Sequence, residues 1–282
     1  MPIGSIVISA NPVMDWESFE QTLSPTDFRK ARSSWRDVGG CRKLNFEIEV
    51  TDQALAIEYF INSPGRQIQT FTPDGRLDWG GMIHTVTLDT GTVTMSMSLK
   101  NIYNNAWARR QPVGGGAVTR TAVQSHAISQ ARFGQKDHVL NAGEMSDGSA
   151  EQYAAKELAL HYWPYLSNFS WGSGRGASLK FSAMGWFDTL GWIVYIQDVA
   201  GGEDDADAIA AAIITECGQF IASSTFQANA TQIAKKNDSD RRGDSILKSI
   251  ASVGDATDNP WVVGVDASRN FYYREAALAK LE

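Results

Sequence analysis

Apolar and polar residues alternate over much of the first hundred positions, which is the period of a strand that buries one face. Between residues 41 and 50, four apolar side chains point one way and three polar ones the other. The same period returns at 77–89 and 93–99, two stretches joined by the turn sequence DTGT. We expect Met82, His84, Val86 and Leu88 to share one face of the first of these strands.

Two glycines suggest how this first part of the chain curves. Gly80 and Gly81 interrupt the long strand near its start, and paired glycines in a strand usually mark a β-bulge or a tight bend. A small β-barrel needs such bends and a flat sheet does not. We therefore expect a strongly curved antiparallel sheet or a small barrel over residues 1–111. A helix capped by Thr51 or Asp52 and a short helix over 99–110 complete this module.

Helical periodicity dominates the second half of the chain. A helix is expected from Ser149 to the residue before Pro164, because proline ends a helix. The other expected elements are strands at 178–186 and 189–198, amphipathic helices at 204–222 and 240–254, and a closing hairpin at 261–274. Strands and helices do not alternate regularly, which favours the α+β class, with helices flanking the sheets.

A glycine-rich stretch divides the chain into expected domains. The sequence QPVGGGAV at 111–118 has the composition of a linker. We therefore expect a curved sheet module at 1–111, a connecting segment at 112–148 and a second α+β module at 149–282. Two modules also fit a length of 282 residues.

Composition and charge exclude several classes of protein. The net charge of −7 argues against a specific nucleic-acid binder, which needs clustered Lys and Arg. No apolar run is long enough to span a membrane, and the first residues do not have the pattern of a secretory signal. We expect two buried free thiols, Cys41 and Cys217, rather than a disulfide, and therefore synthesis in the cytosol. Nine Trp, eight Tyr and twelve Phe allow well-filled cores or extensive subunit contacts.

Reactive groups do not occur in a spacing typical of catalysis. None of the four histidines has the spacing of a zinc-binding helix, and no CxxC motif occurs. The glycine-rich stretch at 171–178 lacks the lysine of a phosphate loop, and the acidic stretch at 237–244 lacks two positions of a calcium loop. We expect no catalytic residue, metal or cofactor. One alternative stays open, because Asp74 and Asp78 beside Trp79 could form part of a sugar cleft.

The order of these motifs resembles that of tail and baseplate proteins of tailed bacteriophages. The resemblance begins with the strand LNFEIEV, the turn SPGR, the segment TPDGR, the strand WGGMI and the segment NNAW. It continues through ARFGQKDHVLNAG, AEQYAAKELALHYWP, SLKFSAMGWFDTLGW and DRRGDSILKSIASVG to the closing hairpin. The resemblance covers nearly the whole chain, although each motif alone is only a pattern common to strands and turns.

This resemblance implies a hub-like structural protein of the tail tip or baseplate. Such a subunit would form a ring around the tail axis, as a trimer or hexamer, and connect the tail tube to distal tail proteins in the virion. It would have no catalytic residues. The positions expected to provide curvature and packing are Gly80, Gly81, Gly185, Trp79, Trp107, Trp186 and Trp261. Two other classes remain: a monomeric carbohydrate-binding or glycan-hydrolysing module, and a cytosolic scaffold unrelated to phage.

Overall fold

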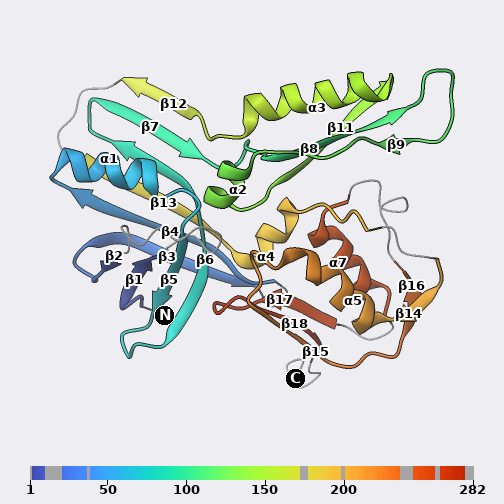
Figure 1. The fold of residues 1–282 in the computed structure, drawn as a ribbon. Coiled ribbons are helices and arrows are strands. Elements are labelled where there is room, and N and C mark those ends of the chain that lie inside the picture. The colour runs from blue at the N-terminus through green and yellow to red at the C-terminus, as the bar shows by residue number, and fades with distance from the viewer. Residues whose placement is uncertain are drawn as a thin grey trace.

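A sheet of twelve described strands forms the centre of the structure (Figure 1). The computed structural model describes residues 2–9, 21–36, 39–171, 177–197, 201–235, 244–257 and 261–276, and only the backbone of 167–171. Strands and helices are mixed without regular alternation, so the α+β class is confirmed.

Six antiparallel strands make up the upper left part of this sheet in Figure 1. In spatial order they are β3 (Phe28–Arg36), β4 (Gly39–Val50), β13 (Ala177–Gly185), β6 (Leu77–Asp89), β7 (Val93–Ser98) and β12 (Leu166–Trp171). Phe46, Phe181 and Val86 lie opposite one another across three of them, and the rings of Phe46 and Phe181 stack at 4.6 Å. Helix α1 (Gln53–Asn62) covers this apolar face, and Asp52 caps it, as the sequence indicates.

Three further strands continue from the first half of β6. They are β5 (Gln67–Phe71), β1 (Ser5–Ile8) and β2 (Gln21–Leu23). Their inward side chains, including Ile6, Ile8 and Ile68, join the core under α1. Among the described residues β2 and β3 do not pair, so the strands do not close and the barrel alternative is wrong.

The register of β6 differs from the expected alternation. Ser182 of β13 lies opposite Thr85, and its neighbour Ala183 lies opposite Ile83, so His84 is an extra residue on β6. Ile83 therefore joins Val86 and Leu88 in one core, while Met82 belongs to a second core formed with the C-terminal helices. The expected common face of Met82 and Val86 is wrong, because a β-bulge reverses the faces on its two sides.

A smaller sheet and two helices lie above the main sheet in Figure 1. The strands are β8 (Asn105–Gln111), β9 (Thr119–Arg120), β10 (Gln124–Ser125) and β11 (Asp137–Glu144), and the helices are α2 (Ala127–Phe133) and α3 (Asp147–His161). The helix expected at 99–110 is wrong, because residues 99–104 form turns and irregular structure and residues 105–110 belong to β8. Ala106 and Ala108 are both buried against α3. Their spacing of two residues is the period of a strand and not of a helix. Residues 112–118 connect β8 to β9, which pair with each other.

The C-terminal part packs helices on the other end of the main sheet. Its strands are β15 (Ser223–Phe226), β17 (Trp261–Val265) and β18 (Asn270–Glu275), with β14 (Glu203–Asp205) and β16 (Gln232–Ala234) as a separate pair, and its helices are α4 (Trp186–Thr189), α5 (Ala206–Ile214) and α7 (Ile246–Asp255). The amphipathic helix expected at 204–222 is confirmed for α5 and the 3-10 turn Thr215–Cys217, although its first two residues belong to strand β14. The helix expected at 240–254 is confirmed for α7, and residues 240–243 lie outside the described residues. The closing hairpin is confirmed. The strand expected at 189–198 is wrong. Trp186 and Leu190 are both fully buried at helical spacing, in α4 and the 3-10 turn Leu190–Trp192.

Strands from the first and last expected modules share the main sheet. β13 lies between β4 and β6, and β17 pairs with the start of β4 at Gly39 and Gly40. The division into modules at residues 111 and 149 stays a prediction. In the structure, strands from both expected modules belong to one sheet.

Candidate assembly surface

Three of the four tryptophans that were expected to provide packing lie in the protein interior. Trp79, Trp107 and Trp186 are almost fully buried, whereas Trp261 is partly buried and stacks on Tyr273 with ring centres 4.6 Å apart. This burial argues against the alternative of a sugar cleft at Asp74 and Asp78, because the Trp79 ring has no exposed face on which a sugar could stack.

The three selected glycines lie together where β4, β6, β13 and the β17–β18 turn meet. A Cβ atom on Gly80 would lie 2.3 Å from the Ala267 carbonyl oxygen, and one on Gly81 would lie 2.1 Å from that of Met184. Gly185 pairs directly with Gly81. These glycines are therefore needed for close backbone approach. Their role in curvature stays a prediction, since Gly80 and Gly81 pair regularly with β5 and the register shift lies at Asp78.

Two partly buried charged side chains, those of Lys136 and Asp137, are held by hydrogen bonds to neighbouring residues. Lys136 donates from Nζ to the carbonyl oxygens of Leu99 and Lys100 at 2.6 and 2.8 Å, and burial lowers its pKa to about 8. Asp137 accepts hydrogen bonds from Asn105, Gln135 and the Val194 backbone. The described residues contain no cluster of three His, Cys, Asp or Glu that could hold a metal. None of the helices in the described ranges is long and apolar enough to cross a membrane. The stretches 172–176 and 236–243, from the two loops considered above, lie outside the described residues.

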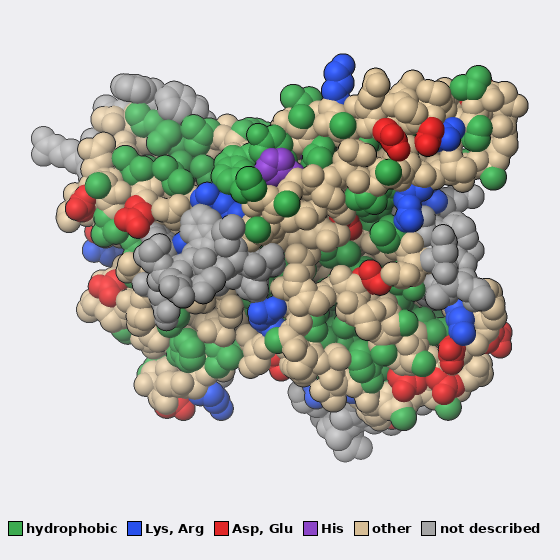
Figure 2. All heavy atoms as spheres, in the orientation of Figure 1, with side chains coloured by type: hydrophobic (Ala, Val, Ile, Leu, Met, Phe, Trp, Pro, Cys, Tyr) green, Lys and Arg blue, Asp and Glu red, His purple; other side chains and the backbone are tan. Residues whose placement is uncertain are grey.

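A group of exposed apolar side chains runs from α1 to the end of α3, and we call it the α1–α3 surface. Figure 2 shows apolar side chains gathered over α1 and around the point where α3 meets β12. The members are Leu55, Ile57 and Ile61 of α1, Ile128 of α2, and Leu160, Trp163, Tyr165 and Leu166 at the end of α3 and the start of β12.

The α1 part of this surface exists because that helix is apolar on more than one side. Tyr59 and Phe60 are buried against the sheet, while Ile57 and Ile61 point outward with about two fifths of their area exposed. A helix that is apolar all round is normally covered on all sides. Ile57 and Ile61 are the sequence signal for this outward apolar face, which the expectations above did not include.

The α3 part of the surface is created where the helix stops. Leu160 is 71% exposed although it lies in the last turn, and Trp163 and Tyr165 follow on either side of the buried Pro164. Tyr165 is fixed by a hydrogen bond that its hydroxyl accepts from Asn101 at 2.9 Å. The large side chains of Leu160, Trp163 and Tyr165 are therefore exposed at the end of α3, and a hydrogen bond fixes one of them.

Arg132 of α2 connects the two parts. Its Nη2 donates to the carbonyl oxygen of Ile61 at 3.0 Å, and its guanidinium lies 5.0 Å from the centre of the Trp163 ring. Burial lowers the pKa of Arg132, which remains a cation at neutral pH. These contacts join α1, α2 and the end of α3, so Arg132 links the two parts of the α1–α3 surface.

Stacked aromatic rings support the α3 end from below. Tyr103 lies between His138 and His161, with ring centres 4.3 and 4.6 Å away, and donates from its hydroxyl to Glu157 at 3.0 Å. His126 stacks on Tyr162 at 4.0 Å. Burial raises the pKa of Tyr103 and lowers that of His138, so both are neutral at pH 7.

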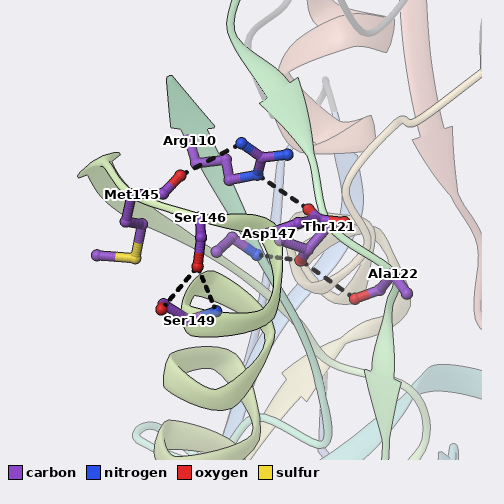
Figure 3. A network of polar contacts seen from close by, with 8 residues as sticks. Arg110, Thr121, Ala122, Met145, Ser146, Asp147 and Ser149 are labelled. Carbon is purple, nitrogen blue, oxygen red and sulfur yellow. Dashed lines mark hydrogen bonds and ion pairs between the residues drawn. The ribbon is translucent and has the colours of Figure 1, made fainter. Parts of the chain in front are cut away.

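The other end of α3 is fixed by a polar network (Figure 3). Arg110 of β8 donates to Asp147 at 2.9 Å and to the Met145 carbonyl oxygen at 3.2 Å. Ser146 caps the helix by accepting from the Ser149 backbone N–H at 3.3 Å. Side-chain contacts therefore anchor both ends of α3, by hydrogen bonds at its start and by stacked rings near its exposed terminal residues.

Comparison with known proteins finds no matching family model, curated protein or solved structure.

Proposed function

We propose that this protein is a structural subunit of a tailed-bacteriophage tail tip or baseplate, a hub-like protein that forms a ring around the tail axis. The α1–α3 surface carries this proposal. Contiguous exposed apolar patches of more than a few hundred Å² usually mark protein contact sites. The residues here have the composition of an interface centre, with Trp, Tyr and a stacked Arg.

Rigidity supports the same proposal. A ring subunit gains from a surface that needs little ordering on binding, because ordering lowers affinity. Arg132, the Tyr103 stack and the capped α3 hold this surface before any partner arrives. The order of sequence motifs points to the tail, where the ring would connect the tail tube to distal proteins as a trimer or hexamer.

The direct experiment is binding to tails of the virion encoded by the same genome. Labelled protein is sedimented with tails, and a Leu160→Glu variant is compared with the original chain. We expect co-sedimentation that the variant loses, because the introduced carboxylate would be buried without a partner.

A glycan array run in parallel separates the alternative class. Retention of a monomer by glycan, without association with tails, would support a carbohydrate-binding module and contradict the structural role.

A further inference from the structure

A second surface, of opposite character, lies along the β3–β4 hairpin. Although the chain has a net charge of −7, six of its 25 Lys and Arg residues fall between positions 28 and 43. We call them the basic edge: Arg29, Lys30, Arg32, Arg36, Arg42 and Lys43, all exposed. The one acid in this stretch, Asp37, lies outside the described residues.

Only part of this charge is neutralised by described residues. Arg29 pairs with Glu49 at 2.5 Å and Lys30 with Glu47 at 2.8 Å. The side chains of the other four cations make no ion pair with a described residue. Burial raises the pKa of the half-buried Asp188, and the nearby Arg36 and Arg42 offset this rise only in part. Positive charge is therefore concentrated on the half of the hairpin nearer its turn.

On its side away from β4, strand β3 has no partner strand among the residues that the structure describes. Among the described residues β3 pairs with β4 alone. A bulge at Lys30, whose φ is 54°, disturbs the first part of the strand. A second register shift lies between Ser34 and Trp35, where Arg42 is an extra residue on β4, so residues 32–36 of β3 itself contain no extra residue. Alternate N–H and C=O groups of residues 32–36 point away from β4 and could pair with another strand. Charges and bulges often protect such edges. Here the bulge at Lys30 lies before residues 32–36, and no described strand pairs with the outer side of these five residues.

The side chains of this five-residue segment define what would fit beside it. Arg32, Ser34 and Arg36 point to one face and Ser33 and Trp35 to the other, because side chains alternate along a strand. Trp35 is 47% exposed and lies opposite the buried Cys41. A neighbouring strand would be favoured by acidic side chains beside the two arginines and by an apolar side chain beside Trp35.

We propose that the β3 edge binds an extended segment of a partner protein in which acidic and apolar residues alternate, by addition of a strand to the sheet. A polypeptide can both donate to and accept from the open backbone, which a nucleic-acid strand cannot do in a strand register. The overall negative charge also disfavours a long polyanion. This binding does not depend on ring formation, since it uses a different surface.

The test uses the full chain and a fluorescein-labelled synthetic peptide of alternating Glu and Val residues. We expect saturable binding by fluorescence anisotropy, with affinity reduced about tenfold or more in the double variant Arg32→Glu, Arg36→Glu. The matched control is Arg76→Glu, Lys156→Glu, which reverses two exposed cations elsewhere and should keep the affinity. Thermal unfolding of each variant confirms that it is folded.

Two further probes distinguish strand addition from simple charge attraction. The same peptide with N-methyl groups on alternate backbone nitrogens keeps its charge and should lose binding. Equal binding of the methylated peptide, or tighter binding of single-stranded DNA, would overturn the proposal, as would absence of peptide binding to the original chain.

Discussion

Gly185 lies so close to Cys41 that a Cβ atom on the glycine would be 1.7 Å from the Cys41 carbonyl oxygen. The clash is with backbone, which cannot rotate away as a flexible side chain could. At this point β13 passes beside β4 before the chain turns into α4. The two cores meet here, so the contact fixes how the C-terminal part joins the sheet.

The Gly185→Ala variant should therefore be strongly destabilised. We expect a loss at or above the upper end of the roughly 1–3 kcal/mol seen for overpacked cores, measured by urea unfolding. Gly148→Ala is the matched control, because a Cβ there meets nothing within 4 Å and the residue lies in the first turn of α3. That change should be neutral or stabilise by up to about 1 kcal/mol. Equal stability of the two variants would contradict the close contact.

Both cysteines should be unreactive in the folded protein. Cys41 and Cys217 are buried and free, as expected from the sequence, and burial raises the pKa of Cys41 to about 12 and that of Cys217 also upward. A thiol-specific reagent at pH 8 should modify neither residue, because the thiolate is the reactive form. Both thiols should react after unfolding in guanidinium chloride. Rapid modification of one thiol without denaturant would contradict its buried position.

Stability should fall in mild acid through His84. Burial, with smaller contributions from Lys136, Lys100 and Lys43, lowers the pKa of His84 from 6.5 to about 4. The unfolded chain therefore binds a proton below about pH 6.5 that the folded chain binds only near pH 4. Lowering the pH across this window should cost roughly 3 kcal/mol through this group. The stability is fully present above pH 6.5.

The control for this effect is His84→Gln, compared with the original chain at each pH. Other histidines and carboxylates titrate in both proteins, so the difference between their unfolding free energies isolates His84. We expect that difference to change between pH 6.5 and 4. A constant difference would show that His84 is not held neutral by the fold.

The α1–α3 surface should determine self-association. Ile57→Glu and Leu160→Glu place carboxylates on its two parts and should lower the assembled fraction, without altering the melting temperature of the monomer by more than a few degrees. Val113→Glu is the control, because Val113 is 72% exposed in the loop between β8 and β9 and outside this surface. If all three variants assemble alike, the surface is not the interface.

Local sequence patterns predicted most elements whose burial follows a simple period. The alternation of Leu44, Phe46 and Ile48 and the helical spacing of Ile209 and Ile213 correspond to buried positions. Asp52 begins α1 as its side chain chemistry indicates, since it accepts from the Ala54 backbone N–H at 2.8 Å. These features depend on neighbours in the chain.

The errors concern segments whose environment comes from distant residues. At 105–111 the alanines of β8 lie against α3, which begins at residue 147. The bulge at His84 depends on pairing with β13, about a hundred residues away. The α1–α3 surface likewise requires Arg132 to reach Ile61. The residue pattern within one segment does not show which distant segment will pack against it. The α1–α3 surface could therefore not be predicted from the sequence.

The most direct test of the proposed structural role is the mass of the purified full chain in solution, measured by light scattering over a range of concentrations. The chain has a mass of 30.8 kDa. We predict a discrete species at three or six times this mass, which the Leu160→Glu variant does not form. A mass of one chain at every concentration, unchanged when tails of the corresponding virion are added, would contradict the proposed ring subunit.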